Sequence, residues 1–164
     1  MQGVRLGHGQ YNGVHGVTSH RGLAPSQGRW DATLAHTAEA LYVKGRNPEA
    51  DREALEGARL IGSSLPRVLA NGDDHDARRE LLEGAMHAGA ALGSAGLGLG
   101  HAMAQALGGR YGISHGALNA VVLAPALRFN EPVAGEEIAR FGEAMGAGDD
   151  VPGAVEDLAR MAGF

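Results

Sequence analysis

The chain has 164 residues, a formal net charge of −5 and 44% hydrophobic residues, which suits one domain with an apolar core. It contains no cysteine, which excludes disulfides, thiolate metal sites and a cysteine nucleophile. No apolar run reaches about 18 residues, the N-terminus lacks a signal-peptide core and no basic patch is dense. We therefore expect a cytoplasmic protein that binds neither membrane nor nucleic acid.

Residues 1–30 differ in composition from the rest of the chain. They hold seven glycines, three histidines and three arginines but no acidic residue, so all 19 Asp and Glu residues lie in 31–164. Their apolar residues show no sustained period. We expect an irregular Gly/His-rich arm over 1–30, able to lie on the acidic body, and a helical metal-binding domain over 31–164.

From residue 31 onward, apolar residues recur at helical spacing. The pattern predicts a first helix that ends at Gly45 and has the inward residues Ala32, Leu34, Ala35, Ala38, Leu41 and Tyr42. Asn47 followed by Pro48 predicts the start of a second helix, because asparagine caps helical N–H groups and proline suits the first helical position. We expect Pro66 to kink this helix and Asn71 with Gly72 to end it.

The remaining pattern is also helical. Asp73 or Asp74 can cap a third helix, in which Gly89 leaves room for a neighbour and the inward residues are Leu81, Leu82, Ala85, Met86 and Leu92. A short fourth helix over 100–108 and a loop over 111–114 lead to a fifth over 115–129, bent near Pro125. Two more are expected near 134–145 and 152–162. With no strand series, the sequence predicts an all-α bundle of about six to seven helices.

Three histidines fall on three of these helices. His36 lies in the first helix, His101 in the fourth and His115 at the start of the fifth. A turn lies between His101 and His115, so the two can come back together in space. Three imidazoles can ligate a catalytic metal and leave a position for water. Packing in the core or on the surface is the alternative for each of them.

A resemblance favours the metal. The segments LAHTAEALYV, NPEADREALEGARLI and GLGLGHAMAQALGGRYGISHGALNAVVLAPALRFN resemble the helical domain of the iron-dependent (group III) alcohol dehydrogenases, above all the maleylacetate reductase branch, over roughly residues 33–162. That family implies an N-terminal dinucleotide-binding domain and a C-terminal helical domain that holds a divalent metal through an Asp and three His. His36, His101 and His115 match the three family histidines, and the resemblance implies that they are metal ligands.

The chain departs from the family pattern beside these histidines. The family acid lies four residues before the first histidine, where this chain has Ala32; Asp31 is one residue further back and on another helix face. Asp31 can complete the ligand set only if the helix starts after it, and a helix N-cap is its alternative role. Gln105 replaces a frequent family histidine, and we favour a polar surface residue there. Arm histidines offer other candidates for a missing ligand: His8, His15 and His20.

Other polar residues receive simpler interpretations. We expect Glu39 and Asp51 to be helix-surface acids. We expect His87 to pack in the core or an interface, with donation to a metal ligand as the alternative. Asn119 follows His115 by four residues and can share its helix face.

The function predicted from these features is hydrolytic. No Gly-rich strand–turn–helix precedes the helical region, so we expect a truncated domain that binds no NAD on its own. A divalent metal, zinc first and iron or manganese as alternatives, lowers the pKa of bound water to about 7. We therefore predict a small metal-dependent hydrolase of activated esters such as phosphotriesters, with a small-molecule substrate and a homodimeric assembly.

Two other hypotheses stay open. The chain can be a metal-binding helical module without catalysis. It can also be a fragment or subunit of an NAD(P)-dependent alcohol dehydrogenase or maleylacetate reductase, which predicts affinity for NAD(H) only together with a nucleotide-binding partner.

Overall fold

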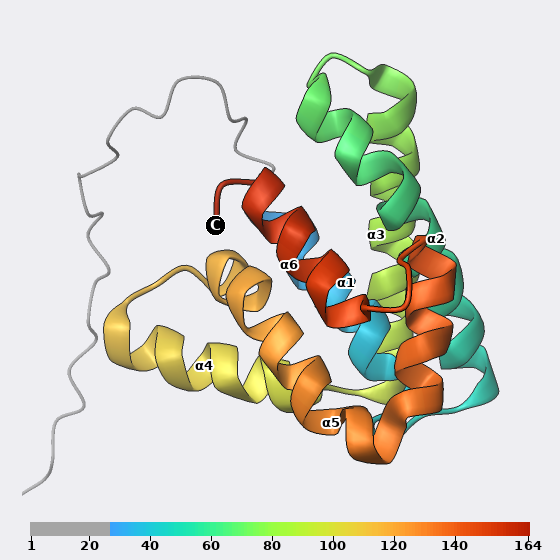
Figure 1. The fold of residues 1–164 in the computed structure, drawn as a ribbon, viewed down its shortest axis with the longest axis vertical. Helices are drawn as coiled ribbons and strands as arrows, with labels where there is room; N and C mark the ends of the chain where they lie inside the picture. The colour runs from blue at the N-terminus through green and yellow to red at the C-terminus, as the bar shows by residue number, and fades with distance from the viewer. Residues whose placement is uncertain (1–26) are drawn as a thin grey trace, which may run out of the picture.

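Six helices joined by short loops form the part of the chain that the computed structural model describes, residues 27–164, with side chains from Ala32 onward (Figure 1). The helices are α1 (Gln27–Ala40), α2 (Pro48–Ala70), α3 (His75–Ala95), α4 (Leu99–Tyr111), α5 (His115–Met145) and α6 (Val151–Met161). No strand occurs within this range, so the predicted all-α class is confirmed. No helix in it is long and apolar enough to cross a membrane.

The first helix begins earlier than the sequence indicates. Helix α1 starts at Gln27, so the last residues of the expected irregular arm are helical. Asp31 therefore lies inside a helix, and its expected role as N-cap is wrong. The rest of the expected arm, with His8, His15 and His20, lies outside the described residues.

The predicted start and stop of α2 and the predicted cap of α3 are confirmed. The Asn47 side chain accepts hydrogen bonds from the backbone N–H groups of Glu49 and Ala50, at 3.1 and 3.0 Å, with Pro48 as the first helical residue. Helix α2 ends at Ala70, and Asp74 caps α3 by accepting from the N–H of Ala77 at 2.9 Å.

Small residues make the interface between α2 and α3. A Cβ on Gly84 would lie 3.1 Å from the Cβ of Leu60, and the buried face of α3 consists of Ala77, Gly84, Ala88, Ala91 and Ala95. The predicted inward face is confirmed only in part: Leu81 packs against the core, whereas Leu82 and Met86 are 69% and 76% exposed. A Cβ on Gly89 would meet no atom of the described residues within 4 Å, so the room that Gly89 leaves is not filled by a neighbouring helix. Alanine and glycine let the two helix axes approach closely, which turns the larger side chains outward.

The fifth and sixth expected helices are the two arms of α5, which a kink separates where the sixth helix was expected to begin. Ala134 has non-helical angles (φ −137°, ψ 27°) two residues after Pro132. Proline disturbs the turn that precedes it, whereas Ala134 follows Pro132, so this clash does not explain the angles of Ala134. Pro125 lies within α5 and Pro66 within α2 without interrupting either helix.

One large apolar core holds most of the helices together, and a small second cluster attaches α4. The large core draws on α1, α2, α3, α5 and α6 and includes the fully buried Phe141. The second cluster, between α4 and α5, contains only Ala104, Leu118 and Val122 as buried members. Helix α4 therefore depends on other contacts for its placement.

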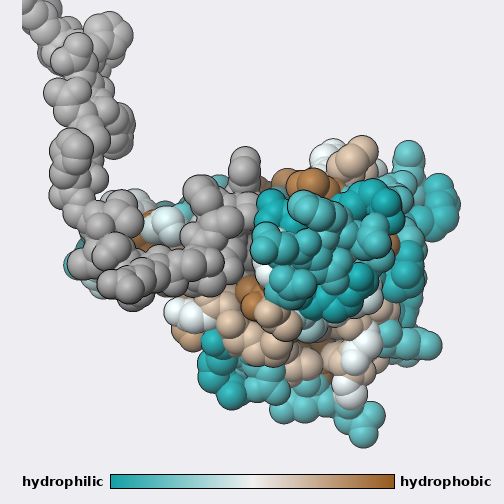
Figure 2. Space-filling view, turned by 90° about the horizontal axis from the view of Figure 1, so that it is seen from above, coloured by the Kyte–Doolittle hydropathy of each residue, from teal (hydrophilic) through white to brown (hydrophobic). Residues whose placement is uncertain are grey.

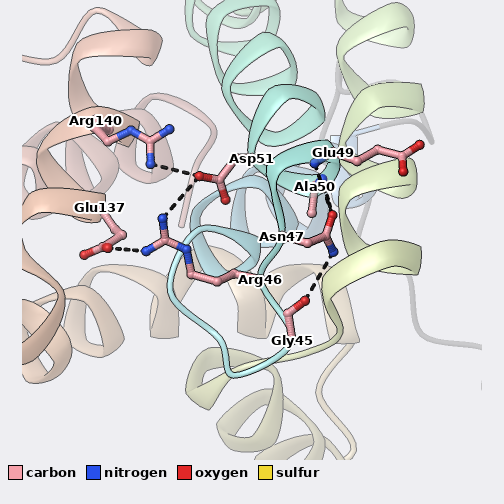
Figure 3. A network of polar contacts seen from close by, with 8 residues as sticks. All are labelled: Gly45, Arg46, Asn47, Glu49, Ala50, Asp51, Glu137 and Arg140. Atoms are coloured by element: carbon pink, nitrogen blue, oxygen red, sulfur yellow. Dashed lines mark hydrogen bonds and ion pairs between the residues drawn. The ribbon is translucent and has the colours of Figure 1, made fainter.

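Ion pairs join the elements at the surface of the large core. Arg46, in the loop before α2, pairs with Glu137 of α5 and, at 3.3 Å, with Asp51 of α2, while Arg140 of α5 lies 2.9 Å from Asp51 (Figure 3). Asp51 is thus an inter-helix partner with a 14% exposed side chain, and the expectation of a simple surface acid was wrong. The end of the molecule seen in Figure 2 is strongly hydrophilic where the turn between α2 and α3 lies, beside a paler and partly apolar surface.

Candidate metal centre

Three histidines from three helices come together at the N-terminal ends of α4 and α5. The ring centroids of His36 (α1) and His101 (α4) are 4.8 Å apart, and those of His101 and His115 (α5) are 5.7 Å apart. His101 is 2% exposed, whereas His115 lies at the surface. The structure therefore brings together the three histidines that the sequence singled out.

A buried carboxylate anchors this cluster. Nδ1 of His101 lies 2.6 Å from Oε2 of Glu39, which also accepts from the N–H of Gly98 at 2.8 Å; Oε1 of Glu39 accepts from the N–H of Gly100 at 2.5 Å. Glu39 is 1% exposed, so its interpretation as a surface acid was wrong. Its burial follows from its position, because it lies three residues after His36 and faces α4 with it.

Glu39 is negatively charged at neutral pH. Burial by itself raises the pKa of this carboxyl, but the hydrogen bonds from His101 and from the N–H groups of Gly98 and Gly100 outweigh burial and hold the pKa below its usual value. A carboxylate only accepts hydrogen bonds, so Nδ1 of His101 carries the proton. In a neutral imidazole, Nε2 is then left with its lone pair.

Two ring nitrogens in the cluster are buried and unsatisfied. Nε2 of His101 and Nδ1 of His36 have no hydrogen-bond partner within the described part of the chain. Burial is the main cause that lowers the pKa of His36, to about 4. The neighbouring His101 and His115 lower this pKa further, whereas the negative charge of Glu39 raises it. His36 is therefore neutral at pH 7, the form in which imidazole binds metals.

The three imidazoles are gathered but not aimed at one point. Among residues 32–164, no three His, Asp or Glu side chains are placed to hold a metal ion as they stand. The planes of His36 and His101 differ by only 22°, in a stacked arrangement. Ring nitrogens direct their lone pairs within the ring plane, and a metal needs each nitrogen at about 2.0–2.1 Å. A rotation of the His36 or His115 side chain is required for convergence.

Of the other candidate residues, Asn119 lies beside the cluster, whereas Gln105 and His87 have other positions. Asn119 is fully buried one turn after His115: its Nδ2 donates to the His115 carbonyl at 3.0 Å, and its Oδ1 has no partner within the described residues. Gln105 is exposed, as expected. The side chain of Asp31 lies outside the described part. His87 bonds through Nδ1 to Glu53 of α2 at 2.7 Å and so occupies the α2–α3 interface.

The sequence held a signal for Glu39 in the glycines opposite it. A Cβ on Gly98 would lie 2.8 Å from Cδ of Glu39, and one on Gly100 would lie 2.9 Å from Oε1. Glycine is required here because the carboxylate approaches the backbone itself. The run GLGLGH thus marks a close approach, but it does not say which distant residue makes it.

Comparison with known proteins agrees with this arrangement. Residues 29–162 match the family model described as "Fe-containing alcohol dehydrogenase family, C-terminal". The chain belongs to the iron-containing alcohol dehydrogenase family.

Curated and solved relatives show how much of the family is represented. The chain is 38% identical over 131 residues to a maleylacetate reductase of Burkholderia cepacia, covering 80% of this chain and 37% of the relative. It is 38% identical over 117 residues to a 1,3-propanediol dehydrogenase of Citrobacter freundii, covering 71% and 30%. The crystal structure of a maleylacetate reductase from Rhizobium sp. strain MTP-10005 superposes with a TM-score of 0.78 at 32% identity, covering 84% and 39%. The chain thus spans about a third of the length of such relatives.

Family membership overturns the predicted hydrolase. The relatives are dehydrogenases and reductases, so the phosphotriesterase-like activity was wrong, and the alternative hypothesis of a dehydrogenase or reductase part fits better. Zinc as first metal loses its support as well, because the family is described by iron. The error came from treating a missing nucleotide-binding segment as evidence for a different reaction. The metal ligands themselves do not decide between the two chemistries.

Proposed function

We propose that this chain is the metal-binding helical part of an NAD(P)-dependent alcohol dehydrogenase or maleylacetate reductase, and that His36, His101 and His115 hold its divalent metal. The observation that carries the proposal is the meeting of three imidazoles from three helices, two of them with buried, unpartnered ring nitrogens. A buried polar atom without a partner is costly, and a bound cation would remove that cost.

The residues present fit a divalent metal. Neutral His36 and the free Nε2 of His101 are nitrogen donors of the kind that iron(II) and other first-row metals accept. Iron(II) replaces zinc as the first candidate because the family is described by iron. A water is our candidate for a further ligand, because helix α1 starts before Asp31 and the condition for ligation by Asp31 is not met. When bound, the metal would act as a Lewis acid on an alcohol or carbonyl oxygen.

The protein's own residues supply the remaining requirements. Glu39 orients His101 through its hydrogen bond with Nδ1. The burial of Glu39 and His101 excludes water from their side of the cluster. His115 is the exposed member, so a small-molecule substrate would reach the cluster beside it.

Hydride transfer also needs a nicotinamide held against the substrate. The described part of the chain, residues 27–164, contains no strand, and dinucleotides usually bind at the carboxyl ends of parallel strands. We propose that a nucleotide-binding part outside these helices holds the nicotinamide.

The homodimeric assembly stays a prediction, to be checked by light scattering.

Metal binding tests the proposal directly. Metal-free protein is titrated with iron(II) without oxygen, and with cobalt(II) as an absorbing probe, in the wild type, in His101→Ala and in His75→Ala. His75 is an exposed histidine on α3 and serves as the matched control. We expect cobalt absorption bands typical of nitrogen ligation in the wild type and His75→Ala and their loss in His101→Ala. Equal binding by all three proteins would refute the three-histidine site.

A further inference from the structure

We propose that Glu39 is a positioning residue that acts on the metal through His101 and, with the same carboxylate, caps helix α4. The inference rests on the proposed function only where it concerns the metal. The part that concerns the helix cap and the His101 ring does not depend on a metal. It rests on hydrogen bonds between the Glu39 carboxylate, the His101 imidazole and the backbone N–H groups of Gly98 and Gly100.

Both oxygens of the Glu39 carboxylate accept hydrogen bonds from neighbouring groups. The carboxylate accepts three hydrogen bonds: from Nδ1 of His101 at 2.6 Å, from the N–H of Gly98 at 2.8 Å and from the N–H of Gly100 at 2.5 Å. Charge-assisted hydrogen bonds of this length are the stronger kind. They fix the imidazole plane and turn its protonated Nδ1 toward Glu39, so that Nε2 points away from the carboxylate. A carboxylate behind a ligating histidine typically orients the ring and raises its basicity.

The same carboxylate takes the place of a missing helix cap. Helix α4 begins after Gly98, which has no side chain to cap it, and no side-chain cap bond from its own sequence is present. Glu39 reaches from α1 and accepts N–H groups that the helix leaves free at its first turn. Its negative charge also lies at the positive end of the helix dipole.

Gly98 and Gly100 allow the Glu39 carboxylate to approach the backbone of α4 closely enough for both roles. A side chain at Gly98 or Gly100 would collide with the Glu39 carboxyl, at 2.8 and 2.9 Å. The placement of α4 and the orientation of His101 therefore depend on the same three atoms of Glu39. A change that moves the carboxylate affects the ligand and the helix together.

The chain offers a matched control in a second carboxylate–histidine pair. Glu53 and His87 meet at 2.7 Å through the same atoms, Oε2 and Nδ1, but both side chains are about a third exposed, at 34% and 30%. This pair joins α2 and α3 at the surface and accepts no backbone N–H. Glu53→Gln therefore changes the same chemical contact without touching the cluster.

The test uses three proteins: wild type, Glu39→Gln and Glu53→Gln. A glutamine at 39 has one acceptor oxygen and directs an NH₂ group at groups that are themselves donors. The first readout is ¹⁵N NMR of the histidine rings in metal-free protein, which reports the tautomer of each ring. We expect a single Nδ1–H tautomer for His101 in the wild type and Glu53→Gln, and a mixture in Glu39→Gln. The second readout is cobalt(II) affinity, expected to fall by about 10–100-fold in Glu39→Gln alone.

The two readouts separate the inference from the proposed function. If the wild type binds no metal but the His101 tautomer still depends on Glu39, the function fails and the positioning role stands. If Glu39→Gln keeps the tautomer and the affinity of the wild type, the positioning role is overturned and the metal site stands. Should Glu39→Gln fail to fold, Gly100→Ala displaces the carboxylate by its Cβ and is read in the same way.

Discussion

Helices α2 and α3 meet at alanine and glycine residues, whereas α4 meets α1 through a buried carboxylate and a histidine. The α2–α3 interface belongs to the large apolar core, whereas the small apolar cluster of α4, with three buried members, joins it to α5 and not to α1. Apolar packing is non-directional and rewards volume and close fit. A buried polar junction is directional and becomes costly when one partner is lost.

The difference indicates where stability and chemistry reside. The α2–α3–α5 body can lose ion pairs at its surface, such as that between Arg59 and Glu56, at small cost, because exposed ion pairs contribute little. The α4 junction carries unsatisfied ring nitrogens and a buried charge, which a fold that served stability alone would avoid. Substitutions in the two regions should therefore separate global stability from metal binding.

The largest effect is expected in the apolar body. Phe141 is fully buried in the large core, and Phe141→Ala should destabilise the protein by about 3–5 kcal/mol. Urea unfolding measures this loss. Under native conditions the folded fraction should keep the His101 tautomer, because the cavity lies in the large core rather than at α4. A change in tautomer in the folded protein would show that the two regions are coupled.

A smaller but more local effect is expected at the junction. Glu39→Ala leaves His101 Nδ1–H and the N–H groups of Gly98 and Gly100 buried without an acceptor, each costing about 1–3 kcal/mol before relaxation. Water entry reduces the sum, so we expect about 2–3 kcal/mol in total. Amide hydrogen exchange should accelerate at the start of α4 and stay unchanged in α2. Uniform acceleration across both helices would contradict a local junction.

The parts of this fold that the sequence predicts are those set by local chemistry. Asn47 with Pro48 and Asp74 mark helix starts through side-chain caps that need no tertiary partner. The three histidines were found because their family pattern is readable along the chain. Their meeting in space agrees with that prediction, while their ligand role remains to be tested.

The parts that the sequence does not predict depend on partners far away in the chain. Glu39 looks like any helical acid until Gly98 and Gly100, about sixty residues later, supply its donors. Leu82 and Met86 look like core residues, because hydrophobicity alone favours burying the large side chains. The helices instead pack through the small ones, and that choice depends on the face that α2 presents.

A pair of glycines on α3 tests this packing register. Gly84→Ala places a methyl group 3.1 Å from the Cβ of Leu60 and should destabilise by about 1–3 kcal/mol. Gly89→Ala faces open space and should stabilise the helix by about 0.5–1 kcal/mol. Thermal unfolding of the two variants gives opposite signs if α3 packs as described. Stabilisation by Gly84→Ala and destabilisation by Gly89→Ala would instead support the inward face of α3 that hydrophobicity predicts.

The smallest effect concerns a polar group inside the apolar region. The hydroxyl of Tyr42 is buried without a partner in the described chain, and burial, with a contribution from Glu39, raises the pKa of Tyr42 well above its ordinary value. In the unfolded chain the phenol ionises near its ordinary pKa of 10.0, so the folded state binds the proton more tightly. This contribution to stability is complete below pH 10 and is lost as the pH rises above the pKa of the unfolded phenol toward the higher pKa of the folded state.

Tyr42→Phe removes both the unsatisfied hydroxyl and the alkaline loss. We expect a gain of about 1 kcal/mol at pH 8, from relief of the buried polar group, and a larger gain at pH 11. Tyr111→Phe is the matched control, because the Tyr111 side chain is 62% exposed and its hydroxyl meets water in both states. Urea unfolding at the two pH values decides the matter. Destabilisation by Tyr42→Phe at pH 8 would mean that the hydroxyl has a partner, and that the apolar body also contains a directional contact.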